Sequence, residues 1–80
     1  MKISADGGTL LTADPSDIDA YGHFKIPDGV TRIGESAFED CFSLETIDIP
    51  NSVTRIEVKA FHGCTSLKEI HIPLIPHLIF

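Results

Sequence analysis

The sequence predicts an α/β solenoid in which successive windings of the chain stack on one another. One observation is a 23-residue period: the dipeptide Ile-Pro recurs at positions 26–27, 49–50 and 72–73. A second is that nearly every large apolar residue in one copy of the period has a partner in the next. A third is a short alternating strand pattern before each Ile-Pro. Such a period is typical of units that bury their apolar side only against their neighbours.

The apolar matches run the full length of the period, so they indicate a packed interior and not a chance similarity. Polar positions match less often, apart from Thr31-Arg32 with Thr54-Arg55 and Ser43 with Ser66. The matched apolar pairs are Val30/Val53, Ile33/Ile56, Ala37/Ala60, Phe38/Phe61, Cys41/Cys64, Leu44/Leu67 and Ile47/Ile70.

Each unit contains one strand and a segment that returns to the start of the next strand. Residues 44–50 alternate apolar and polar, and Pro50 ends the run because proline cannot donate to a strand ladder. By the repeat, strands are expected at 21–27, 44–50 and 67–73, parallel and on the concave side. Ala60, Phe61 and Cys64 have helical spacing, which predicts one or two short helical turns on the convex side.

The first 25 residues are predicted to be a degenerate capping unit. The period extends backwards without a gap, since Ile3 matches Ile26, Leu10 matches Ile33 and Ile18 matches Cys41. Terminal repeats are expected to be atypical, because one of their sides faces solvent. Residues 1–25 are therefore read as a cap and residues 26–73 as two full repeats.

The pattern stops after position 73, and residues 74–80 form an apolar tail. This tail either caps the last unit or serves as an association surface, because contiguous exposed apolar residues mark association sites. A truncated or frame-shifted end is a third interpretation. The residues concerned are Leu74, Ile75, Leu78, Ile79 and Phe80.

The repeated pattern Ile-Pro-x-x-Val-Thr-x-Ile-x-x-x-Ala-Phe-x-x-Cys-x-x-Leu-x-x-Ile-x-Ile-Pro resembles the BspA-like leucine-rich repeats of bacterial and protozoan surface proteins. Gly34 fits the Ile-Gly pair of that family, whereas Glu57 departs from it. The resemblance implies a short right-handed leucine-rich-repeat array with parallel strands. It also implies binding to proteins or host surfaces, without catalysis.

Outward strand positions predict a binding face, because solenoids bind partners on extended concave surfaces. Equivalent positions of neighbouring units lie about 4.8 Å apart and form columns. Opposite charges are expected to pair across units, Lys25 with Asp48 and Glu45 with Lys68, which could also simply stabilise the stacking. The predicted protein-binding residues are His23, Lys25, Thr46, Asp48, Glu69 and His71.

The sequence predicts no metal site, no cofactor site and no catalytic residues. Cys41 and Cys64 occupy an inward apolar position, where free buried thiols are favoured over a disulfide between stacked units. The four histidines lack metal-binding spacing, and Asp14, Asp17 and Asp19 lack the glycine and glutamate of a calcium loop. Capping of a short helical turn by Asp14 or Ser16 is the preferred explanation for that cluster. No serine or glycine-rich motif of an enzyme is present.

The charge balance bears on the class of partner. Twelve acidic and six basic residues give a net charge of −6, which disfavours direct binding to nucleic acid. The preferred function is a non-enzymatic protein-binding module with a protein partner. The alternatives are a small acidic inhibitor or nucleic-acid mimic in the basic groove of an enzyme, and a homo-oligomer assembled through residues 74–80.

The start of the chain carries no apolar run of a secretion signal, and no stretch is long enough to span a bilayer. A cytoplasmic location is therefore expected if the chain is complete. The alternative is a fragment of a cell-surface or secreted protein.

Overall fold

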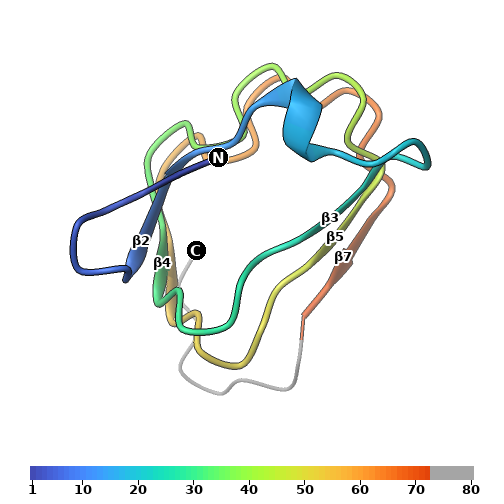
Figure 1. Ribbon diagram of the computed structural model, residues 1–80. Coiled ribbons are helices and arrows are strands. Elements are labelled where there is room, and N and C mark those ends of the chain that lie inside the picture. The colour runs from blue at the N-terminus through green and yellow to red at the C-terminus, as the bar shows by residue number, and fades with distance from the viewer. Residues whose placement is uncertain (73–80) are drawn as a thin grey trace.

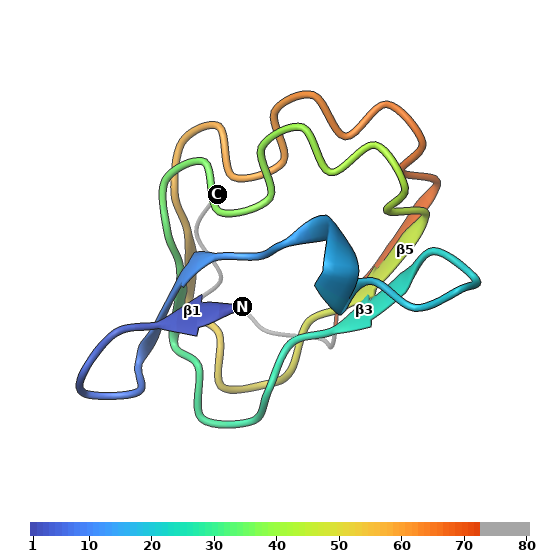
Figure 2. The same cartoon turned by 45° about the horizontal axis from the view of Figure 1, so that its top comes forward.

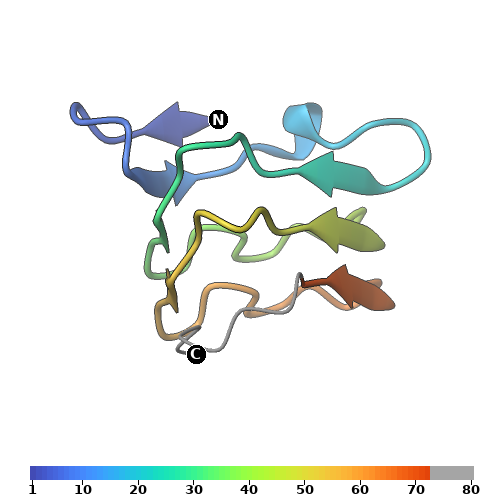
Figure 3. The same cartoon turned by 90° about the horizontal axis from the view of Figure 1, so that it is seen from below.

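The computed structural model describes residues 1–72, and residues 73–80 lie outside that description (Figure 1). The predictions for the apolar tail fall on those last residues, so they stay predictions. Within residues 1–72 the chain makes three windings, here called unit 1 (4–26), unit 2 (27–49) and unit 3 (50–72). Figure 3 shows the units stacked as layers, with the strands of one edge lying one below another in chain order.

One sheet consists of β3 (His23–Lys25), β5 (Thr46–Asp48) and β7 (Glu69–His71). All pairs are parallel, and each residue lies opposite its equivalent in the next unit, as in Phe24↔Ile47↔Ile70. The predicted parallel strands are confirmed in place and register. They are shorter than expected, at three residues each.

A second sheet was not predicted as strands. It has the order β1 (Lys2–Ile3), β2 (Thr9–Thr12), β4 (Arg32–Ile33) and β6 (Arg55–Ile56). The pairs β2–β4 and β4–β6 are parallel with the same register as the first sheet. The sequence indicates only that Val30 and Ile33 turn back into the interior. A bend would place them there as well as a two-residue strand does.

The strand β1 departs from the period. It runs antiparallel to β2 with Ile3 opposite Leu10, so the alignment of Ile3 with Ile26 is wrong. The alignment of Leu10 with Ile33 is confirmed by the parallel pairing. A hairpin over the free edge of β2 satisfies backbone groups that would otherwise be exposed at the end of the sheet.

In the predicted strand 21–27, Tyr21 takes the inward position that Leu44 has one period later, but Tyr21 is 86% exposed whereas Leu44 is fully buried. The Asp19 carboxylate accepts the amide protons of Tyr21 and His23, at 2.9 and 3.0 Å. Gly22 adopts a φ of +77°, and a Cβ there would lie 2.8 Å from the Ser43 carbonyl oxygen. This aspartate-stabilised loop projects from the body of the molecule before β3 and carries Tyr21 into solvent (Figure 2).

The helical turns expected around Ala60, Phe61 and Cys64 do not form. Residues 1–72 contain no α-helix, and their one helical segment is the 3₁₀ turn η1 (Pro15–Asp17). Asp14 is its N-cap residue, and the Asp17 carboxylate accepts the Asp14 amide proton at 2.8 Å.

Positive φ angles explain why a helix cannot continue. They occur at Ser36 and Lys59, near +57°, and at the equivalent pair Asp40 and Gly63, at +57° and +78°. A left-handed residue reverses the backbone, and the freed amides bond to the next unit: Phe38 N–H donates to the Ala60 carbonyl at 2.7 Å.

The core lies between the two sheets and the turn segments. Phe38 is fully buried at its centre, with an edge-to-face contact to Phe24 at 5.1 Å and a stacked contact to Phe61 at 5.2 Å. Burial falls in unit 3: Ile47 and Ile49 are 0% and 2% exposed, whereas their equivalents Ile70 and Ile72 are 41% and 38% exposed. Unit 2 is therefore the best-packed part of the described chain.

We expect Phe38→Ala to lower the free energy of unfolding by about 3–5 kcal/mol, the usual loss for a fully buried aromatic ring. Phe61→Ala should cost clearly less, because Phe61 is only partly buried. Urea unfolding followed by circular dichroism measures both. Phe42→Ala, at a 60% exposed side chain, is the control and should change stability by less than about 0.5 kcal/mol. Equal losses at positions 38 and 61 would contradict the described packing.

Lys59→Gly should stabilise the protein by about 0.5–1 kcal/mol. A non-glycine residue in the left-handed conformation costs about 1–2 kcal/mol of stability, and glycine removes that cost. Part of the stabilisation is lost again, because glycine makes the unfolded chain more flexible. The same unfolding assay applies. Glu39→Gly, at an exposed position without a positive φ, should instead be destabilising. A loss of stability for Lys59→Gly would show that the left-handed turn is not required there.

Candidate functional site

The outer face of the β3–β5–β7 sheet brings five of the six predicted binding residues into one hydrogen-bonded network. The parallel register places His23, Thr46 and Glu69 in one column and Lys25, Asp48 and His71 in the next. Side chains at alternate strand positions share a face, so the two columns flank the inward column of Phe24, Ile47 and Ile70, of which Phe24 and Ile47 are buried. The short strands and the strict register thus fix this surface.

Asp48 is the centre of the network. Its Oδ2 lies 3.2 Å from His23 Nε2, and its Oδ1 lies 2.7 Å from His71 Nδ1. The carboxylate therefore joins units 1 and 3 through unit 2. At the ends, His23 Nδ1 lies 2.7 Å from the Thr46 hydroxyl, and His71 Nε2 lies 2.9 Å from Glu69 Oε2.

Lys25 does not join this network. The ion pair expected between Lys25 and Asp48 is wrong: within residues 1–72 Asp48 pairs with the two histidines, and Lys25 has no ion pair. The imidazole rings are shorter and stiffer than a lysine side chain, so they reach the carboxylate at less conformational cost. The second expected pair is confirmed, since Lys68 Nζ lies 3.0 Å from Glu45 Oε1.

The surroundings of His71 favour its charged form. The hydrogen bond to Glu69 is the largest cause that raises the pKa of His71 above its ordinary value, followed by the hydrogen bond to Asp48. Both partners are carboxylates, which stabilise an imidazolium.

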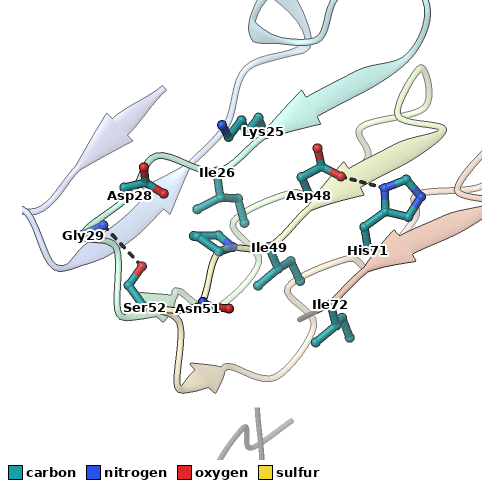
Figure 4. Close-up of a pocket in the computed structure, with 11 residues that line it drawn as sticks. Lys25, Ile26, Asp28, Gly29, Asp48, Ile49, Asn51, Ser52, His71 and Ile72 are labelled. Carbon is teal, nitrogen blue, oxygen red and sulfur yellow. Dashed lines mark hydrogen bonds and ion pairs between the residues drawn. The ribbon is translucent and has the colours of Figure 1, made fainter. Parts of the chain in front are cut away.

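A depression of about 670 Å³ adjoins the network, where the chain leaves the three strands (Figure 4). Lys25, Asp48 and His71 line one side of it, and the turns after the Ile-Pro pairs line the other. Gly29 N–H donates to Ser52 Oγ at 3.2 Å and ties these turns together. The turn residues, which the sequence reading did not single out, are Asp28, Gly29, Asn51 and Ser52.

A second charged cluster, on the other sheet, was also missed. Glu57 Oε2 lies 2.8 Å from Arg55 Nε and 3.4 Å from Arg32 Nε. The two arginines are direct neighbours in the β4–β6 register, so their repulsion needs a counter-charge. Two features of the sequence indicate the cluster. One is the repeated Thr-Arg pair, and the other is Glu57, which stands where the preceding unit has Gly34.

Cys41 and Cys64 are free thiols, as favoured from the sequence. The Cys64 thiol donates to the Phe38 carbonyl at 3.0 Å, and the Cys41 thiol lies 3.9 Å from the Ala13 carbonyl. Burial is the main cause that raises the pKa of both thiols. They therefore act as small core residues whose thiolate form is disfavoured.

Residues 1–72 contain no group of three or more histidine, cysteine or acidic side chains placed to hold a metal ion. Over the same range, no helix has the length and apolar character needed to cross a bilayer.

A 23-residue repeat with parallel strands stacked at constant register, and an outward polar face, defines a repeat protein of the leucine-rich class. The family model for the BspA type leucine rich repeat region, a model of six copies, matches residues 17–77. The chain therefore belongs to the BspA-type leucine-rich repeat family, whose repeats are generally non-catalytic and typically bind proteins.

A solved structure agrees with this assignment. The crystal structure of a leucine rich cell surface protein from Faecalibacterium prausnitzii A2-165 matches with 47% sequence identity and a TM-score of 0.58. The match covers 61% of this chain and 13% of the other, so the chain spans a small part of the length of that protein. No curated protein sequence matches the chain.

We expect both thiols to react slowly with a disulfide reagent in the native state, about tenfold slower than in urea, because burial disfavours the thiolate. Ellman's reagent at constant pH measures the rates. Single-thiol variants Cys41→Ala and Cys64→Ala assign them, and Cys64 should react first because it is less buried. Native rates equal to the unfolded rates would contradict the buried-thiol description.

Proposed function

We propose that the chain is a non-enzymatic protein-binding module whose contact surface is the outer face of the β3–β5–β7 sheet. Its main support is the network centred on Asp48, which holds side chains from all three units in one arrangement. A surface ordered before binding loses less side-chain entropy when a partner arrives. The adjoining depression adds an indentation beside that network.

We infer further that the stacked units form a short right-handed solenoid with this sheet on its concave side. Parallel strands joined by crossovers are right-handed in nearly all known cases. The turn segments 34–43 and 57–66 would form the convex side. Binding on concave surfaces is characteristic of solenoid proteins, which links the shape to the function.

A non-enzymatic role accords with the site chemistry. The two histidines face carboxylates and a threonine hydroxyl, and both cysteine thiols are held in the core. General acid–base or nucleophilic catalysis needs such groups within reach of a substrate and tuned for reaction. The network therefore fits recognition better than catalysis.

A location at the cell surface is the corresponding proposal. It rests on the F. prausnitzii relative, which is described as a leucine rich cell surface protein. The chain would then be one segment of a longer surface array, in agreement with the six-copy family model.

The two other candidate functions each have one supporting observation. The net charge of −6 favours an acidic inhibitor of a basic enzyme groove. The exposure of Ile70 and Ile72 favours assembly of several copies through the end of unit 3 and the tail. Light scattering of the intact chain and of a chain ending at Pro73 tests the second: equal monomeric masses would exclude assembly through the tail.

The principal test compares how strongly two charge-reversal variants bind the proteins that the chain captures from its source cell. Lys25→Glu changes the proposed face, whereas Lys2→Glu makes the same charge change in the other sheet. Proteins captured from the source cell by the immobilised chain, identified by mass spectrometry, should bind Lys25→Glu about tenfold more weakly, a loss typical of a contact residue. Lys2→Glu should bind them normally, and equal binding to both variants would exclude this face.

Salt separates the module from the acidic inhibitor. The affinity of an acidic mimic should fall steeply between low and high ionic strength, because its contacts are long-range charge pairs. The proposed face contains both signs of charge, so its affinity should fall only modestly. Isothermal titration with a captured partner at two salt concentrations decides between them.

A further inference from the structure

We propose that the proton carried by His71 fastens unit 3 to unit 2, so that the β3–β5–β7 sheet contains a built-in pH-sensitive contact. This inference concerns the stability of the sheet and does not depend on the binding function proposed above. It rests on the geometry of the two histidines that flank Asp48.

Both ring nitrogens of His71 face carboxylate oxygens, Asp48 Oδ1 at 2.7 Å from Nδ1 and Glu69 Oε2 at 2.9 Å from Nε2. An ionised carboxylate only accepts hydrogen bonds, and a neutral imidazole has one N–H donor. Both contacts can be hydrogen bonds only when the ring carries two protons. The observed geometry is therefore that of an imidazolium.

His23 has different partners although it contacts the same aspartate. Its Nε2 lies 3.2 Å from Asp48 Oδ2, and its Nδ1 lies 2.7 Å from the Thr46 hydroxyl. A hydroxyl can donate as well as accept, so a neutral His23 satisfies both contacts. The link between units 1 and 2 therefore needs no added proton, whereas the link between units 2 and 3 does.

The charged groups around His71 come from each strand of the sheet. Glu69 lies on its own strand, Asp48 on β5, and His23 and Lys25 on β3. Glu45 and Lys68 stand directly before β5 and β7 and pair with each other, Glu45 Oε1 lying 3.0 Å from Lys68 Nζ. When His71 releases its proton to water, the net charge of Asp48, Glu69 and His71 changes from −1 to −2.

The direction of the pH effect follows from the folded environment. The contacts to Glu69 and Asp48 raise the pKa of His71 above its ordinary value of 6.5. A raised folded pKa gives a stabilising contribution that is fully present below about pH 6.5 and is lost as the pH rises through the folded pKa. Above that pH one carboxylate faces a ring nitrogen without a proton, and the contact between β5 and β7 weakens.

The first experiment measures the His71 titration by NMR of the imidazole ring in the full chain. The pKa of His71 should lie above 6.5, and Glu69→Gln and Asp48→Asn should each lower it. Glu45→Gln is the matched control: it removes a carboxylate that stands directly before β5 and pairs with Lys68 instead of His71. A wild-type pKa at or below 6.5, or equal shifts in all three variants, would overturn the proposal.

The second experiment measures amide hydrogen exchange at two equivalent positions. Ile49 N–H donates to the His71 carbonyl at 3.0 Å, and Ile26 N–H donates to the Asp48 carbonyl at 3.1 Å. After correction for intrinsic exchange, protection of Ile49 should fall about two- to fivefold across the His71 titration, the range open to an exposed ion pair. Ile26 should retain its protection. Parallel changes at both amides, or no change at Ile49, would exclude a contact specific to units 2 and 3.

Discussion

The backbone hydrogen bonds between successive units are the constraint on which the rest of this structure depends. Thr54 N–H donates to the Thr31 carbonyl and Glu57 N–H to the Ile33 carbonyl, and the corresponding amides of unit 2 donate to Gly8 and Leu10. Each unit buries its apolar side chains only against the units above and below it. Any displacement along the strands would break these bonds and would also separate the matched apolar columns.

Close spacing between units decides several residue types. A Cβ on Gly34 would lie 2.9 Å from the Leu10 carbonyl oxygen, and one on Gly63 would collide with the Asp40 side chain. The same closeness lets the turn segments bond to their neighbours, which is why left-handed turns replace helices there. Unit 2 has neighbours on both sides, and it accordingly contains most of the largest fully buried side chains, among them Phe38, Leu44 and Ile47.

The repeat was sufficient to predict the parallel register, because matched apolar columns allow one alignment only. It could not predict β1, since an antiparallel hairpin follows the local chain and not the period. It also missed the left-handed turns, because Ser36, Lys59 and Asp40 carry no strong conformational signal. For the candidate site, the columns were predicted but the diagonal contact from His23 to Asp48 was not. Side-chain reach and stiffness, which spacing does not encode, determined that Asp48 would pair with histidine and not with Lys25.

The position of Asp48 between two histidines from different units has a consequence for how such surfaces change in evolution. Duplication or loss of one 23-residue unit leaves the register of the remaining backbone bonds and apolar columns unchanged, so it is compatible with the fold. Insertion of a unit between the second and third would nevertheless move His71 one layer away from Asp48 and divide the network. The polar network on this sheet thus depends on the order of neighbouring repeats, even where the scaffold does not depend on their number.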